Sequence, residues 1–400
     1  METGYSEKEL IEKDERYVIH GWGYSPIVLV EGKGAIVKDI NGREYIDAIS
    51  QMAGPTSIGA SHPKVVEAVK KQVEKISLTF SGSINIPRVE LSEKLAKITP
   101  PKLNKFFFAC GGSEAVETAL EGAMKITGKN EVISLYNAYH GGTLATLSLG
   151  QPCHREGFPT IPGFRQIPSP YCYRCSYGKE YPSCNFECAR ALEDMIRYGT
   201  YNNVAAFIAE PMLGNGGHII PPDKEYFKIV REICDKYDVL LITDEIQTGF
   251  GRTGKMWACE HYDFQPDIMV VGKAMGGGLP ISATVFREDI LPSDFGKRAW
   301  HTFTFSGAPI VCAAASAAID VVIEEKLPEE AAKMGDFMME RLKLMQEKHP
   351  LIGDVRGKGL FIGVELVKDK KTKEKAVDEA ARVLKKSEEK GVLFGISSSV

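Results

Sequence analysis

The stretch VLLITDEIQTGFGRTGKMWACEHYDFQPDIMVVGKAMGGGLP (239–280) decides the fold, because it holds two short apolar runs that each lead to one charged residue. VLLIT (239–243) ends at Asp244, and IMVV (268–271) leads to Lys273. Short apolar runs bounded by polar or glycine residues are typical of buried strands. Because the carboxyl ends of parallel strands meet at one edge of a sheet, we expect both charged residues to lie at that edge.

Other apolar runs extend the pattern toward the N-terminus. They are FFFA (106–109), VISLY (132–136) and VAAFIA (204–209). Apolar residues at helical spacing predict helices over 115–128 and 225–237. Strands that alternate with helices predict an α/β fold, in which helices sandwich a mostly parallel sheet.

The two flanks of the chain have a different pattern. Two β-rich arms surround Asn41-Gly42, which is a hairpin turn signal, and strand-like and helical segments follow residue 310. We therefore expect a large domain over 61–310 and a smaller α/β domain built from both termini, residues 1–60 and 311–400.

Composition places the chain among ordinary globular proteins. It has 400 residues, 44% of them hydrophobic and 26% charged, and a formal net charge of −4. Nothing in this balance indicates a nucleic-acid partner. No run approaches the roughly 20 apolar residues of a membrane span, and the charged N-terminus lacks the features of a secretory signal. Nine cysteines, an odd count, favour reduced thiols. We therefore expect a cytoplasmic enzyme with no membrane partner.

The segment GGSEAVETAL, which follows the first of these strands, predicts an anion site. Gly112 and Ser113 stand just before a helix, where free backbone N–H groups and the helix dipole favour a phosphate. The alternative is that Ser113 only caps the helix. The residues alone do not decide between the two.

Lys273 ends a buried strand, so it is not a simple surface charge. A phosphate-binding GxxxxGK[ST] loop would need Ser or Thr directly after the lysine, where this chain has Ala274. A desolvated lysine can instead form a Schiff base with an aldehyde cofactor. Pyridoxal phosphate combines an aldehyde, a phosphate and a pyridine nitrogen, and Asp244 is the candidate to keep that nitrogen protonated.

Several motifs together resemble those of class III pyridoxal-phosphate aminotransferases of fold type I, over nearly the whole chain. They are the segment 242–280, GGSEA, NAYHGG, the AEP tripeptide, TFSGAP (304–309) and GDVRGKGLFIGVEL (353–366). The last of these and NAYHGG are most similar to the branch of alanine–glyoxylate and ω-amino acid aminotransferases. The resemblance implies a homodimer with shared active sites.

The resemblance also implies roles for individual residues. Lys273 would form the Schiff base, and Asp244 would pair with the pyridine nitrogen. Gln247 would bind the ring hydroxyl, while Ile246 and Tyr139 would pack on opposite ring faces.

The phosphate would be held by Gly112, Ser113 and, from the neighbouring subunit, Thr304. Glu210 would lie near the cofactor. In relatives this glutamate can pair with an arginine that binds the substrate carboxylate, and that arginine is expected beyond residue 400.

The predicted reaction is transfer of an amino group from an amino acid or ω-amino acid to a 2-oxo acid such as pyruvate, glyoxylate or 2-oxoglutarate. The same scaffold hosts dialkylglycine decarboxylases and amino-acid racemases, so these remain alternatives. A binding protein without turnover is a further alternative, although the lysine, aspartate, glutamine and phosphate group are all present.

The loop YCYRCSYGKEYPSCNFEC (171–188) contains two closely spaced pairs of cysteines, which are Cys172 with Cys175 and Cys184 with Cys188. Two close pairs of cysteines suit a tetrahedral zinc site or an iron–sulfur cluster, and four unligated thiols are the alternative.

Three further residues have simpler interpretations. His140 is expected to orient its loop. Trp22 and Tyr24 either wall the substrate pocket or pack at the surface.

Overall fold

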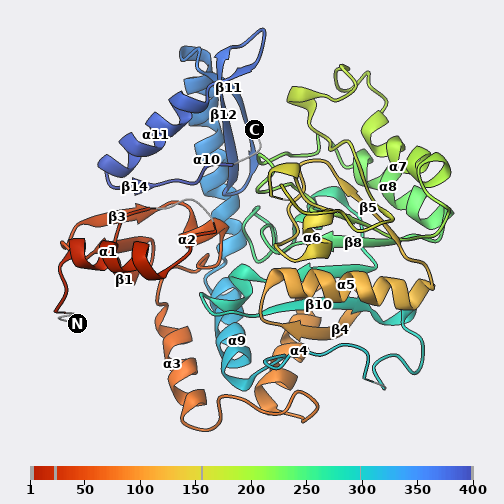
Figure 1. Ribbon diagram of the computed structural model, residues 1–400, viewed down its shortest axis with the longest axis horizontal. Helices are drawn as coiled ribbons and strands as arrows, with labels where there is room; N and C mark the ends of the chain where they lie inside the picture. The colour runs from red at the N-terminus through yellow and green to blue at the C-terminus, as the bar shows by residue number, and fades with distance from the viewer. Residues whose placement is uncertain (1–3, 22–24, 155, 298, 398–400) are drawn as a thin grey trace.

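A seven-stranded sheet forms the centre of the computed structural model, which describes residues 4–21, 25–154, 156–297 and 299–397 (Figure 1). Trp22 and Tyr24 lie outside the described residues. The strand order is β4 (Leu103–Ala109), β10 (Ser282–Arg287), β9 (Ile268–Val271), β8 (Leu240–Asp244), β7 (Val204–Ala209), β5 (Glu131–Leu135) and β6 (Phe164–Ile167). Six of these strands run in one direction, and β10 runs in the opposite direction between β4 and β9.

Helices cover both faces of this sheet, so its central strands are buried on both sides. In β7, Ala206 and Ile208 pack in one hydrophobic cluster with helix α5 (Gly112–Thr127), while Phe207 packs in the other with α8 (Glu225–Lys236). The alternation explains why VAAFIA is apolar at every position. The remaining helices of the described chain are α1 (Glu7–Tyr17), α2 (Ser50–Ala53), α3 (Pro63–Val73), α4 (Ile86–Ile98), α6 (Leu144–Ser148), α7 (Glu187–Tyr198), α9 (Pro309–Glu324), α10 (Leu327–Lys348) and α11 (Val377–Glu389).

Strands from near both ends of the chain share one small sheet. Its order is β1 (Leu29–Lys33), β2 (Ile36–Asp39), β3 (Glu44–Asp47) and β14 (Val392–Leu393), and β14 lies parallel to β3 (Figure 1). A second small sheet follows α10 and contains β11 (Ile352–Lys358), β12 (Phe361–Asp369) and β13 (Glu374–Lys375). The predicted fold class, a large mostly parallel sheet with a smaller part from both termini, is confirmed. The boundaries at residues 60 and 310 stay predictions.

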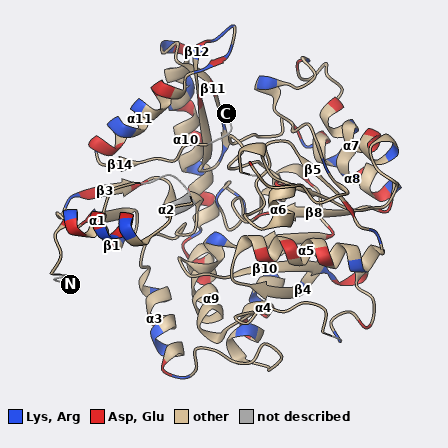
Figure 2. Cartoon of the chain, in the orientation of Figure 1, with Lys and Arg blue, Asp and Glu red and all other residues tan. Residues whose placement is uncertain are grey.

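Charged side chains of both signs are mixed along the outer helices, as α1 and α11 show in Figure 2. Some of them pair along one helix face, for example Lys8 with Glu12 and Arg382 with Glu379. Within the described ranges, no helix is both long and apolar enough to cross a membrane.

Candidate active site

The predicted site residues gather at the carboxyl ends of three adjacent strands. Asp244 is the last residue of β8, Glu210 follows β7, and Lys273 follows β9 after one glycine. Lys273 starts a short 3-10 turn (Lys273–Gly276) and has a positive φ of 45°. A non-glycine residue in this region is strained, and such strain concentrates at functional sites.

The Lys273 amine lies in a partly buried position near two acids. Burial lowers the pKa of the amine, and the negative charges of Asp244 and Glu210 oppose that shift. A lysine with a lowered pKa is neutral more often, and the neutral amine is the form that can act as nucleophile or base.

Asp244 is buried and held by two hydrogen bonds. Its Oδ1 accepts the N–H of Ile246 at 3.1 Å, and its Oδ2 lies 2.8 Å from Nδ1 of the buried His140. We expected His140 only to orient its loop, so its contact with Asp244 is one that the sequence did not reveal. Each carboxylate oxygen can accept a second hydrogen bond, which leaves Asp244 able to bind a ring N–H.

Glu210 is buried beside this pair. Its carboxylate accepts the N–H of Tyr139 at 2.9 Å and the N–H of Gly214 at 2.8 Å. Burial raises the pKa of Glu210 to about 7, although these two hydrogen bonds act to lower it. The carboxyl group is therefore poised to change its protonation state near neutral pH.

Helix α5 begins at the same edge, where the anion site is predicted. The N–H groups of Gly112 and Ser113 open the helix and have no acceptor within it. The Ser113 hydroxyl accepts the N–H of Gly142 at 3.0 Å, which joins the helix start to the loop that carries Tyr139. Glu114 accepts the N–H groups of Cys110 and Gly111.

Ile246 and Gln247 lie between these groups. A Cβ atom on Gly112 would stand 2.8 Å from Ile246 Cδ1, and one on Gly214 would stand 2.0 Å from Gln247 Oε1. Ile246 therefore packs against the anion site, and Gln247 packs against the segment that follows Glu210.

Tyr139 and Thr304 complete the predicted set. The Tyr139 ring meets His154 edge-on with ring centres 5.2 Å apart, and burial raises the pKa of its hydroxyl. Thr304 lies on an exposed turn. The single chain thus brings together all the predicted cofactor residues except Thr304.

This arrangement fits a cofactor that carries a phosphate, a ring nitrogen and an aldehyde. The start of α5 suits the phosphate, Asp244 suits the ring nitrogen, and Lys273 suits the aldehyde. Ile246 lies so close to Gly112 that a Cβ atom at this position would force the Ile246 side chain to shift. A glycine here suits a phosphate site in which backbone N–H groups contact the phosphate closely.

The fold and these residues together define a pyridoxal-phosphate-dependent enzyme of fold type I. Residues 19–399 match the protein family described as Aminotransferase class-III. The chain belongs to the class III aminotransferase family.

Known proteins with similar sequences or structures include both aminotransferases and a racemase. A leucine/methionine racemase of Thermococcus litoralis is 42% identical, over 92% of this chain and 84% of the relative. An acetylornithine aminotransferase of Methanocaldococcus jannaschii is 38% identical, over 98% and 92%. The pyridoxal-phosphate-bound crystal structure of an amine transaminase from an uncultivated Pseudomonas species has a TM-score of 0.90 at 32% identity, over 95% of this chain and 92% of that one.

Gly112→Ala should weaken pyridoxal-phosphate binding by about 10-fold, because the added methyl group would press on Ile246 beside the phosphate site. Titration of the cofactor-free variant with pyridoxal phosphate, followed by visible absorbance, measures this. Gly111→Ala is the matched control, since a Cβ atom there meets nothing within 4 Å and its φ of −113° suits alanine. Equal affinity in the two variants would contradict the assignment.

The cysteine loop does not support the predicted zinc or iron–sulfur site. Cys172, Cys175, Cys184 and Cys188 are all free cysteines, and no group of three or more His, Cys, Asp or Glu in the described chain is arranged to hold a metal ion. Burial, followed by the charges of the other cysteines, raises the pKa of Cys172 to about 11. The close spacing in sequence thus brings the thiols near each other without placing them as ligands.

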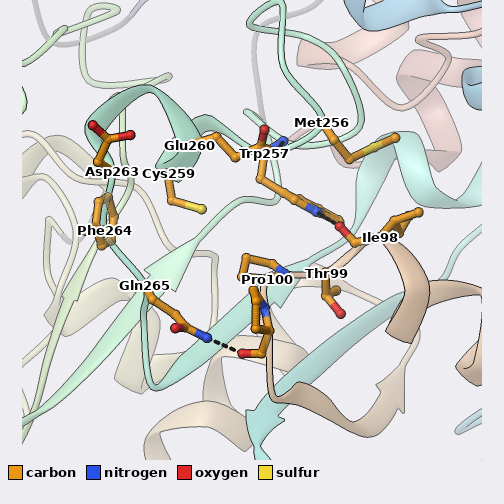
Figure 3. Close-up of a pocket in the computed structure, with 11 residues that line it drawn as sticks. Ile98, Thr99, Pro100, Met256, Trp257, Cys259, Glu260, Asp263, Phe264 and Gln265 are labelled. Atoms are coloured by element: carbon orange, nitrogen blue, oxygen red, sulfur yellow. Dashed lines mark hydrogen bonds between the residues drawn. The ribbon is translucent and has the colours of Figure 1, made fainter.

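A pocket of about 730 Å³ lies away from this site (Figure 3). Pro100 and Pro101 stand before β4, and Gln265 stands before β9, so the pocket lies at the amino ends of these strands. The Trp257 indole donates to the carbonyl of Ile98 at 2.6 Å across its wall. None of the predicted cofactor residues lines this pocket.

Proposed function

We propose that the enzyme moves an amino group from an amino acid or ω-amino acid to a 2-oxo acid, with pyruvate, glyoxylate and 2-oxoglutarate as candidate acceptors. The observation that carries this proposal is the Lys273 amine, which lies at the strand ends near Asp244 and Glu210. The cofactor supplies an aldehyde that takes up the amino group and a ring that accepts electrons.

The residues of the chain would then divide the work. Lys273 would hold the cofactor and move a proton at the substrate Cα atom. Asp244, oriented by His140, would keep the ring nitrogen protonated. Gln247 would bind the ring hydroxyl, and Ile246 and Tyr139 would enclose the ring.

Racemisation of an amino acid is the second candidate function. It is favoured by the 42% identical leucine/methionine racemase. Both reactions begin with removal of the Cα proton, and they differ in where the proton returns. Racemisation needs no 2-oxo acid, which makes the two easy to separate.

The deciding experiment incubates the holoenzyme with single L-amino acids or ω-amino acids, with and without each 2-oxo acid. Transamination predicts a new amino acid formed only when the acceptor is present, at a rate equal to loss of the donor. Formation of the D-amino acid without an acceptor would instead establish racemisation. Chiral chromatography of both samples measures the two outcomes together.

We further propose a homodimer in which Thr304 reaches the site of the neighbouring subunit. Exposed apolar side chains lie on the segment of Thr304 and on a second segment: Phe305 is 56% exposed, and Ile84 and Ile86 are 87% and 72% exposed. Asn85 donates to the carbonyl of Gly307 at 3.1 Å and so joins the two exposed segments. Exposed apolar side chains on two joined segments suit burial against a second copy.

Ile84→Asp should weaken the dimer by at least about 10-fold and lower activity with it, because a charge would be placed in the apolar surface. Sedimentation and rate measurements over a range of enzyme concentrations test both effects. Tyr201→Asp is the control, since Tyr201 is 90% exposed on a turn before β7. An unchanged dimer in Ile84→Asp would argue against this surface.

A further inference from the structure

The segment 213–219 forms one wall of the site. It begins and ends with paired backbone hydrogen bonds between Leu213 and Ile219. Gly214, near its start, donates to the Glu210 carboxylate at 2.8 Å and contacts Gln247. A Cβ atom on Gly216 would stand 1.9 Å from the carbonyl oxygen of Asn137, so this segment also packs against the loop that carries Tyr139.

The opposite side of the same segment is held by Arg356 of β11. Its Nη2 donates to the carbonyl of Gly217 at 2.6 Å, and its Nε donates to the carbonyl of His218 at 2.8 Å. Gly217 and His218 both have positive φ values, 110° and 51°. The arginine therefore binds backbone carbonyls of a segment in an uncommon conformation.

Arg356 is itself fixed on all sides. Its Nη1 lies 2.6 Å from Asp354 and 2.8 Å from Glu365, and Nη2 lies 3.2 Å from the hydroxyl of Tyr171. The side chain is only 13% exposed. A planar guanidinium that is held by two carboxylates can direct its remaining N–H groups at fixed points.

Strand β12 packs closely against the same segment. A Cβ atom on Gly363 would stand 2.7 Å from His218 Cβ, and the His218 ring packs on Phe361 with centres 4.4 Å apart. Both contacts and the Arg356 hydrogen bonds come from the sheet that follows α10. The 213–219 segment therefore transmits the position of that sheet to Glu210.

We infer that Arg356 is a positioning residue for the active site: by holding the carbonyls of Gly217 and His218, it keeps the Gly214 N–H on the Glu210 carboxylate. This inference rests on the proposed function and adds a role for Glu210, whose carboxylate charge acts on the nearby Lys273 amine. Among its described hydrogen bonds, Arg356 has none to Lys273 or Asp244, so it acts on the site through the 213–219 segment, and the route we infer is the hydrogen bond from Gly214 to Glu210.

A double-mutant cycle in the holoenzyme tests this route. Arg356→Lys keeps the charge, but a single ammonium group does not reproduce the fork that binds two carbonyls. It should lower kcat/KM by about fivefold in the parent and by less than about twofold when Glu210 is already Gln. An equal loss in both backgrounds would overturn the inference, because Arg356 would then act independently of Glu210.

The pH profile supplies a second readout. Loss of the Gly214 hydrogen bond removes an interaction that lowers the Glu210 pKa, so the limb of the kcat/KM profile that depends on Glu210 should move to higher pH in Arg356→Lys. If Glu210→Gln lowers kcat/KM but this limb does not move in Arg356→Lys, the inference is also overturned.

Arg174→Lys is the matched control for folding. Arg174 Nε binds the same Glu365 at 2.6 Å but makes no hydrogen bond to the 213–219 segment in the described chain. It should lose similar thermal stability while kcat/KM and the pH profile stay as in the parent. Glu210→Gln with unchanged kcat/KM would refute the role proposed for Glu210 itself, and with it the inference. If Glu210→Gln lowers kcat/KM and its effect adds fully to that of Arg356→Lys, the inference about Arg356 is refuted while the role of Glu210 stands.

Discussion

Lys273→Ala should lower kcat by at least about 10⁴-fold, because it removes both the amine that holds the cofactor and the group that moves the Cα proton. The visible absorbance of the lysine-bound cofactor should disappear in the same variant. Initial rates with an established donor and acceptor pair, together with absorbance spectra of the purified protein, measure these two losses.

Lys255→Ala is the control for this variant. Lys255 is exposed and donates only to the carbonyl of Glu260 among its described contacts, so its removal should leave rate and spectrum unchanged. If Lys273→Ala kept both the spectrum and turnover, the amine at the end of β9 would not be the reactive group.

Asp244→Asn should lower kcat by about 10³-fold with little change in size or packing. The neutral amide no longer stabilises a positive charge on the ring nitrogen, and that charge is what allows the ring to accept electrons. Its contact with His140 is altered as well, since the amide and the ring nitrogen must find new donor and acceptor roles. Rates and thermal melting of the holoenzyme separate loss of chemistry from loss of stability.

The neighbouring acid provides a strict comparison. Glu245 is also buried, but its carboxylate accepts the N–H of Cys259 at 2.8 Å and the hydroxyl of Thr248. Burial raises the pKa of Glu245 to about 7, so Gln resembles the protonated form already present near neutral pH. We expect Glu245→Gln to keep kcat within about threefold. Equal losses in the two variants would assign Asp244 a structural role.

The strand ends were predictable because each is marked locally. An apolar run followed by a polar residue requires no knowledge of distant partners, so the positions of Asp244 and Lys273 follow from the sequence. Strand β10 was missed because SATVFR (282–287) has no strong apolar run and is stabilised by antiparallel pairing with β4 and β9. Strand β6 was missed for the same reason, as FRQI (164–167) has only two apolar residues.

The partnership of His140 with Asp244 required the sheet order. The two residues are 104 positions apart. His140 follows β5 and Asp244 ends β8, and these two strands stand on either side of β7. Only that order brings the two segments together. The sequence left the cysteine loop open between a metal site and unligated thiols for a related reason, since spacing along the chain does not fix the directions of four side chains.

The pairing of β14 with β3 also sets a limit on when this protein can finish folding. Arg43, just before β3, binds the carbonyls of Glu388 and Glu389, which are 345 and 346 residues later in the chain. A contact with such a large sequence separation closes a very long loop, so it forms late. On the ribosome, the small sheet must wait with one edge open until β14 has been synthesised, while the large sheet already has all of its strands.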